Sequence, residues 1–275
     1  MAYRGKNLRS GDLAEQLGAL LLQNVALVSP VPRTEDVGID LVATLLRNFN
    51  GYNYIAEDSF YVQIKSSSVT EIAFKGQKVK WLYELQLPFF VASVDRKTST
   101  IHLYCAHYLS DVFVTNPNRK EIIMEFADTM EYDCSDERES IRVPLGPCVL
   151  SWSLKELEAD NTFIEKFYKL LKMHVLIAKK SIETRRVGFV DQISWETGKS
   201  PKVNQQKIKL VKTKLTQEIV APYLSSFLME LVLEKDLFTT RSLYCLLEKK
   251  LEYEGQFEEI GSKRVLKPFK AKFKK

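Results

Sequence analysis

The fold is decided by the stretch from residue 36 to residue 67, which reads DVGIDLVATLLRNFNGYNYIAEDSFYVQIKSS. Residues 39–46 are rich in branched apolar side chains and predict a β-strand. Asn50-Gly51 follows, a dipeptide typical of the turn in a β-hairpin. Residues 60–65 alternate between the two faces of an extended chain, which predicts a second strand. The stretch therefore predicts two neighbouring antiparallel strands.

Helix and strand patterns continue on both sides of this hairpin. Before it, apolar residues recur at helical spacing from Leu13 to Leu21, with Ser10 or Asp12 as the expected N-cap. After it we expect a strand at 69–74, a short helix at 78–86, and strands at 89–94 and 101–105. The order is helix, three strands, helix and strand, with one further strand, so the fold class is α/β.

The second half of the chain has a different period. Apolar residues recur every three or four positions over residues 153–182, as an amphipathic helix requires. We expect further helices at 204–233, divided or kinked at Pro222, and at 239–252. The expected organisation is a mixed α/β domain at 1–155, followed by an α-helical domain at 156–275 with a basic C-terminal tail.

Composition excludes several classes of protein. The 275 residues are 45% hydrophobic and 27% charged, which is ordinary for a globular chain. No apolar run approaches the ~20 residues that cross a bilayer. The four cysteines form no CxxC pair and have no zinc-like spacing, which favours buried free thiols. We therefore expect a soluble cytoplasmic protein that does not bind a membrane.

Charge is distributed unevenly along the chain. Residues 1–150 carry 15 Lys/Arg and 19 Asp/Glu, whereas residues 151–275 carry 25 and 16, for net charges of −4 and +9. Two acid-free stretches, 198–217 and 262–275, concentrate the excess. Such runs are either solvated faces or surfaces for a polyanion, because clustered cations displace counterions from phosphates. The second interpretation predicts these nucleic-acid ligands: Lys207, Lys209, Lys212, Lys214, Lys263, Arg264 and Lys267.

Polar residues of the first half combine into a candidate catalytic site. Adjacent antiparallel strands lie ~4.8 Å apart, so Asp40 can lie beside Gln63 and Lys65 on one face. A carboxylate and an amide carbonyl are hard oxygen ligands that suit Mg²⁺. Lys65 could orient an attacking water or stabilise charge on a phosphoryl group. Glu15, on the first helix, could extend the metal shell directly or through a water.

Each of these residues also has a structural interpretation. Glu15 could be the capping-box partner of Asp12, which requires no metal. Asp40 could end a strand, and Gln63 and Lys65 could lie on the solvent face of an ordinary strand. The combination in order, on elements of the expected type, favours the catalytic interpretation.

Together these residues resemble the PD-(D/E)XK nuclease superfamily. The resemblance is carried by residues 36–41, by residues 62–67, and by Trp81-Leu82 followed by residues 89–95. It is closest to the branch with Gln in place of the acidic residue, as in Mrr-type restriction endonucleases. Residues 11–105 look like a prokaryotic family of uncharacterised domains in that superfamily. The resemblance does not extend past about residue 155.

The resemblance implies a restriction-endonuclease-like αβββαβ core and metal-dependent cleavage of phosphodiesters. It makes Asp40, Gln63 and Glu15 ligands of Mg²⁺ or Mn²⁺, and it makes Lys65 the catalytic lysine. Two departures matter. Ile39 stands where the family name has proline, and Gln63 carries one negative charge less than Glu would, which weakens metal binding.

The expected function is therefore a Mg²⁺-dependent endonuclease that acts on DNA rather than RNA, and the resemblance adds defence against foreign DNA. The alternative is a catalytically inactive nuclease fold that binds nucleic acid or serves in an assembly. The helices of the second half could form a homodimer interface, and cleavage could require an activating partner protein.

Overall fold

The computed structural model describes residues 6–31, 38–133, 135–160, 162–186 and 188–208. The chain divides into two compact units, Met1–Lys209 and Leu210–Lys275. All described residues belong to the first unit. From residue 209 onward the helix expected at 204–233 lies outside the described residues, as do the helix expected at 239–252 and the basic tail.

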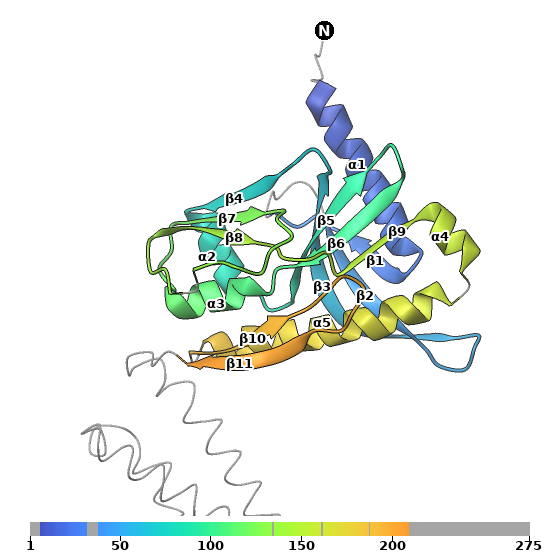
Figure 1. Cartoon of the computed structure of the whole chain (residues 1–275). Helices are drawn as coiled ribbons and strands as arrows, with labels where there is room; N and C mark the ends of the chain where they lie inside the picture. The colour runs from blue at the N-terminus through green and yellow to red at the C-terminus, as the bar shows by residue number, and fades with distance from the viewer. Residues whose placement is uncertain (1–5, 32–37, 134, 161, 187, 209–275) are drawn as a thin grey trace, which may run out of the picture. The chain divides into compact units, whose positions relative to one another are not determined.

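A six-stranded mixed sheet forms the centre of this unit (Figure 1). Its strand order is β1-β2-β3-β5-β6-β9, and every neighbouring pair is antiparallel except β3 and β5. That parallel pair requires a crossover connection, which here contains β4 and α2. The strands are Ala26–Pro30 (β1), Leu41–Asn48 (β2), Tyr54–Ser66 (β3), Phe89–Asp95 (β5), Thr100–Cys105 (β6) and Leu150–Ser153 (β9).

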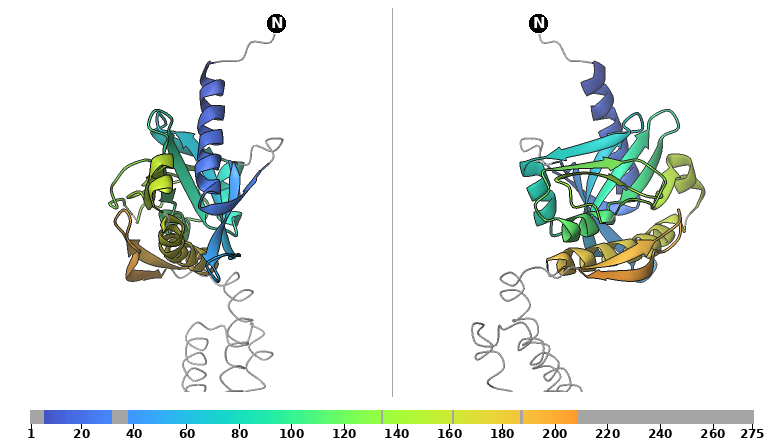
Figure 2. Two further views of the ribbon diagram at one scale, coloured as in Figure 1. Left: turned by 90° about the vertical axis from the view of Figure 1, so that its right-hand side faces the viewer. Right: turned by 60° about the vertical axis from the view of Figure 1, so that its left-hand side comes forward.

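Helices and a second sheet cover the two faces of the central sheet (Figures 1 and 2). Helices α1 (Lys6–Gln23) and α5 (Phe163–Arg185) pack on one face, and α4 (Leu154–Ala159) follows β9. The other face is covered by α2 (Gln77–Glu84), α3 (Tyr108–Thr115) and a three-stranded sheet of β4 (Glu71–Lys75), β7 (Glu121–Glu125) and β8 (Ser140–Pro144). A hairpin of β10 (Phe189–Ser194) and β11 (Lys202–Ile208) runs alongside α5 (Figure 2).

Strand β3 separates two hydrophobic cores because its side chains alternate between the faces. Phe60, Val62 and Ile64 belong to the core under α1 and α5, whereas Tyr61 packs in the core under α2 and α3. A Cβ on Gly18 would lie 3.0 Å from the methyl groups of Ile64, so glycine allows α1 to approach the sheet closely.

Most expected elements of the first half are present, but two interpretations are wrong. The strand predicted at 69–74 is β4, and it pairs with β7 in the smaller sheet instead of joining the hairpin. Instead, β1 pairs with β2, so that β1, β2 and β3 form an antiparallel meander. Helix α1 already contains Lys6, so Ser10 and Asp12 lie inside the helix and neither caps it.

The second half differs more from its prediction. The helix expected over 153–182 is two helices, and the first begins with a capping box of Ser153 and Glu156. Residues 204–208 belong to β11, not to a helix. The boundary predicted between 155 and 156 falls inside α4. The chain after it also belongs to the main sheet's core, where Phe167, Leu171 and Val175 of α5 are buried.

The described part of the chain holds no helix with both the length and the hydropathy that spanning a membrane requires. Two of the four cysteines are described: Cys105 is a buried free thiol, and Cys148 is a half-buried one. Burial raises the pKa of both thiols, that of Cys148 to about 12.

Candidate active site

Asp40 joins the ends of the two central strands, one residue before β2. Its N–H donates to the carbonyl of Val62 at 3.0 Å, and its carboxylate Oδ2 accepts from the N–H of Ile64 at 2.5 Å. Asp40 therefore contacts the backbone on both sides of Gln63 and continues the register of β2 and β3. The predicted proximity of Asp40 and Gln63 is present in the structure.

Gln63 is buried at the same place, with 6% of its surface exposed. Its Oε1 has no hydrogen-bond partner among the described residues. An unsatisfied buried carbonyl costs about 1–3 kcal/mol. The Gln63 side chain lies beside Gly38, where a Cβ would be 3.7 Å from Nε2, and Phe74 and Trp81 lie equally close to that position. The sequence therefore keeps a polar oxygen in an apolar environment.

Lys65 follows two residues later on the same face of β3, opposite Ser93 of β5. Its side chain is half-buried. Within the described chain, no hydrogen bond or ion pair involves its ammonium group. A lysine in this position has its charge available for a ligand beside the Asp40–Gln63 pair.

Glu15 lies on the other side of the sheet. Gly18, one turn later in α1, contacts Ile64 and Val94, whose side chains point away from the face of Gln63. Glu15 is half-buried and lies toward the end of β3 that carries Lys65. The structure therefore brings three of the four predicted catalytic residues to one face and leaves Glu15 on α1 behind it. Its alternative role as the capping-box partner of Asp12 is excluded, because both residues lie inside the helix.

The donor set of this site fits a hard divalent cation. Asp40 offers a carboxylate and Gln63 a carbonyl oxygen that lacks a partner, and Mg²⁺ binds through one or two such ligands while keeping several waters. No group of three His, Cys, Asp or Glu residues with metal-binding geometry occurs in the described part of the chain. The site would therefore hold a cation by few protein ligands.

Lys207 is committed elsewhere in the fold, so its predicted role in nucleic-acid binding is not supported. Its Nζ lies 2.7 Å from Oδ1 of the buried Asp111 and donates to Oγ1 of Thr115 at 2.7 Å. This ion pair ties β11 to α3. The other predicted nucleic-acid ligands lie outside the described residues: Lys209, Lys212, Lys214, Lys263, Arg264 and Lys267.

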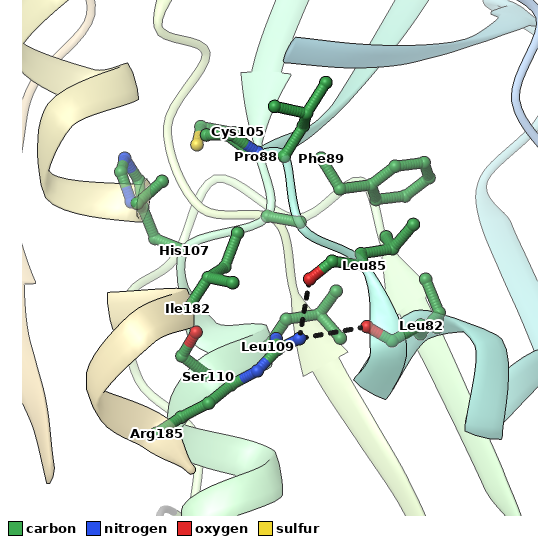
Figure 3. A pocket seen from close by; sticks show the side chains of 13 residues that line it. Leu82, Leu85, Pro88, Phe89, Cys105, His107, Leu109, Ser110, Ile182 and Arg185 are labelled. Atoms are coloured by element: carbon green, nitrogen blue, oxygen red, sulfur yellow. Dashed lines mark hydrogen bonds between the residues drawn. The ribbon is translucent and has the colours of Figure 1, made fainter. Parts of the chain in front are cut away.

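The cavity in Figure 3 lies apart from this site, between α2, α3 and α5. Its volume of about 20 Å³ holds one water. Arg185 lies beside it and donates to the carbonyls of Leu82, Tyr83 and Leu85, at the end of α2. These contacts satisfy helix-terminal carbonyls, so Arg185 has a structural role.

Two polar residues near Lys65 were missed from the sequence. Ser93 lies opposite Lys65 on β5, and His102 lies opposite Ser93 on β6. The available signal was Ser93 itself, a hydroxyl in the otherwise apolar run 89–94. His102 gave no comparable signal, because its spacing of five residues from His107 fits no metal pattern.

Comparison with known proteins gave no match: no family model, no curated protein and no solved structure is significantly similar to the chain. Inferences about function therefore depend on the geometry above.

Proposed function

We propose that the protein is a metal-dependent nuclease that hydrolyses phosphodiester bonds of DNA. The observation that carries this proposal is the buried Oε1 of Gln63, which has no partner in the described chain. Asp40 is hydrogen-bonded to the backbone of Val62 and Ile64, on either side of this residue. A carbonyl kept dry and unsatisfied at a cost in stability is explained if it binds a cation.

In this proposal Asp40 and Gln63 hold Mg²⁺ or Mn²⁺, whereas Glu15, which lies behind this face on α1, is not among the ligands. The bound cation supplies a Lewis acid that polarises the phosphoryl oxygen and acidifies a water. Lys65 stabilises the negative charge that develops on the phosphate, because its ammonium group lies on the same face as Gln63. The hydrogen bond from the N–H of Ile64 holds the Asp40 carboxylate in place.

The order of elements supports the same function. Helix α1 and strands β1, β2 and β3 are followed by β4 of the smaller sheet, and then by α2 and β5. Apart from β4, this is the αβββαβ order that the resemblance to PD-(D/E)XK nucleases implies. Asp40 directly precedes β2, the second of the three strands β1-β2-β3, and Gln63-Ile64-Lys65 lie on β3, the third. Defence against foreign DNA remains part of this proposal through the resemblance alone, and a cytoplasmic location remains part of it through the composition and the cysteines.

A second candidate is a nuclease fold that binds nucleic acid, or joins an assembly, without cleaving. One observation favours it: the Asp40 carboxylate already accepts the N–H of Ile64, which is a sufficient structural reason for aspartate at this position. Gln63 in place of an acid points in the same direction, because it lowers the negative charge of the site.

Cleavage assays separate the two candidates. The full chain is incubated with supercoiled, linear and single-stranded DNA and with RNA, in Mg²⁺, Mn²⁺ or EDTA. Asp40→Asn keeps an oxygen for Ile64 N–H and removes the charge, and Lys65→Met removes the ammonium. Lys80→Met, an exposed residue of α2, is the control for loss of one positive charge.

The nuclease proposal expects metal-dependent products from the wild type and from Lys80→Met, and a loss of at least 100-fold in Asp40→Asn and Lys65→Met. Wild-type chain that binds DNA but cleaves no substrate in either metal supports the second candidate. Equal cleavage by Asp40→Asn and wild type contradicts the proposed site.

A further inference from the structure

A row of polar side chains crosses the central sheet beside the candidate site. Lys65 of β3 pairs with Ser93 of β5, Ser93 with His102 of β6, and His102 with Ser151 of β9. Residues that pair directly across strands point to the same face, so these four side chains lie in one line across four strands. We call this line the polar row.

The polar row differs from the rows beside it. The preceding row on this face consists of Gln63, Val91 and Tyr104, of which Val91 is fully buried and Tyr104 packs on Phe126. In the polar row, Lys65, His102 and Ser151 are half-buried, and Ser93 between them is 7% exposed. The row therefore lies where the covered part of this face gives way to the open part.

No side chain of the polar row has a hydrogen bond, ion pair or ring contact with any described residue. The hydrophobic core under α1 and α5 lies on the opposite face of the same strands, where it contains Ile101, Leu103 and Trp152. Packing in that core therefore does not explain the line of four polar groups. An ammonium, an imidazole and two hydroxyls share one property, which is that each can donate to an anionic oxygen.

The surroundings of the row favour an anion with repeated charges. Arg96 and Lys97 are exposed in the turn that connects β5 to β6, directly beyond this end of the sheet. Strands lie ~4.8 Å apart, so Lys65 and His102, two strands apart, are separated by ~10 Å. The row thus has the reach to contact more than one phosphate of a single strand.

We propose that Lys65, Ser93, His102 and Ser151 form a phosphate-binding row that holds one strand of DNA beside the Asp40–Gln63 pair. His102 donates to a different phosphate of the same strand from the one that Lys65 contacts, and Ser93 lies between them. The proposal rests on the proposed function for its ligand, and it adds residues on β5, β6 and β9 that the catalytic pattern does not contain.

Binding measured without cleavage tests the row. The probe is a fluorescently labelled DNA oligonucleotide of 20 nucleotides, single-stranded or duplex, titrated with the full chain in EDTA and followed by anisotropy at several salt concentrations. His102→Leu removes the donor, and His102→Gln retains an N–H. Tyr104→Phe removes a hydroxyl two residues away on the same strand and face, and serves as the matched control.

We expect His102→Leu to weaken binding about tenfold, the loss of one hydrogen bond to a charged group. His102→Gln and Tyr104→Phe should stay within about twofold of the wild type. Lys65→Met should also reduce the dependence of log Kd on log salt by about one unit.

Equal DNA binding by His102→Leu and the wild type refutes the proposal that the polar row binds phosphate, and it does not affect the nuclease proposal. Loss of affinity in His102→Leu with no cleavage by the wild type supports the row and contradicts the nuclease. A wild-type chain that binds no DNA in EDTA, or that prefers RNA of the same sequence, overturns the proposal as stated.

Discussion

The carboxylate of Asp40 accepts a hydrogen bond of 2.5 Å from the backbone N–H of Ile64. A side chain here takes the place of a backbone acceptor at the point where β2 begins, so the register of β2 and β3 continues to Gln63. Asp40 consequently has a structural role and a proposed chemical role in the same group. Asparagine is the informative replacement, because it preserves the first role and removes the charge required for the second.

The buried amide of Gln63 leads to a prediction about stability. Gln63→Met keeps the volume and removes the unsatisfied Oε1, so the free energy of unfolding in EDTA should stay the same or rise by about 1–2 kcal/mol. Added Mg²⁺ should raise the melting temperature of the wild type and leave Gln63→Met unchanged. Urea and thermal denaturation with and without Mg²⁺ measure both effects. A variant that Mg²⁺ stabilises as much as the wild type would remove Gln63 from the metal site.

Gly38 provides a second prediction, because its φ of +80° lies in the left-handed region. Gly38→Ala should destabilise the protein by about 1–2 kcal/mol although there is room for a methyl group. Gly11→Ala is the matched control: Gly11 lies in α1 with no atom within 4 Å of a Cβ, so this change should stabilise by about 0.5–1 kcal/mol. Urea denaturation measures both, and opposite signs are expected.

The ion pair of Lys207 and Asp111 gives a third prediction. Lys207→Ala leaves the Asp111 carboxylate buried without a counter-charge and should cost about 3–5 kcal/mol. Lys202→Ala, an exposed lysine of the same strand, should change stability by less than about 0.5 kcal/mol. If Lys207 binds nucleic acid instead, Lys207→Ala will weaken DNA binding with little effect on unfolding.

The pair of His107, directly before α3, and His174 of α5 predicts a dependence of stability on pH. His107 Nε2 and His174 Nδ1 lie 2.9 Å apart, and burial lowers the pKa of His174 from 6.5 to about 4. Below pH 6.5 the unfolded chain binds a proton that the folded chain does not, so stability falls as the pH decreases toward 4 and is constant above about 7.5. Burial also lowers the pKa of His107, so its contribution has the same sign.

Urea unfolding at pH 7.5 and pH 5 measures this effect, and a loss of about 2 kcal/mol per histidine is expected over that range. Carboxylates with lowered pKa, such as Glu57 and Asp160 at about 2, lose their contribution only below this window. His174→Gln should reduce the slope, whereas the exposed control Lys80→Met should preserve it. Equal slopes in both variants would contradict the assignment.

Local pattern predicted the strands that form the site because their side chains alternate strictly. Residues 60–65 and 89–94 were assigned correctly, since one residue in two must enter a core. The strand β4 was predicted, but the sheet that it joins was not, because the side-chain pattern of a strand does not specify its partner. Strand β4 pairs with β7, whose residues lie 46 to 54 positions later in the chain. The hairpin β10–β11 was missed because Lys202–Ile208 is polar and offers no clear period.

The sequence alone determined that Asp40, Gln63 and Lys65 come to one place, because a hairpin fixes which residues of two strands lie side by side. Only the tertiary structure decided what surrounds them. It placed α1 and Glu15 on the opposite face, committed Lys207 to Asp111, and aligned Ser93, His102 and Ser151 with Lys65. These relationships join residues far apart in the chain, and they arise from which faces pack together, which no local periodicity specifies.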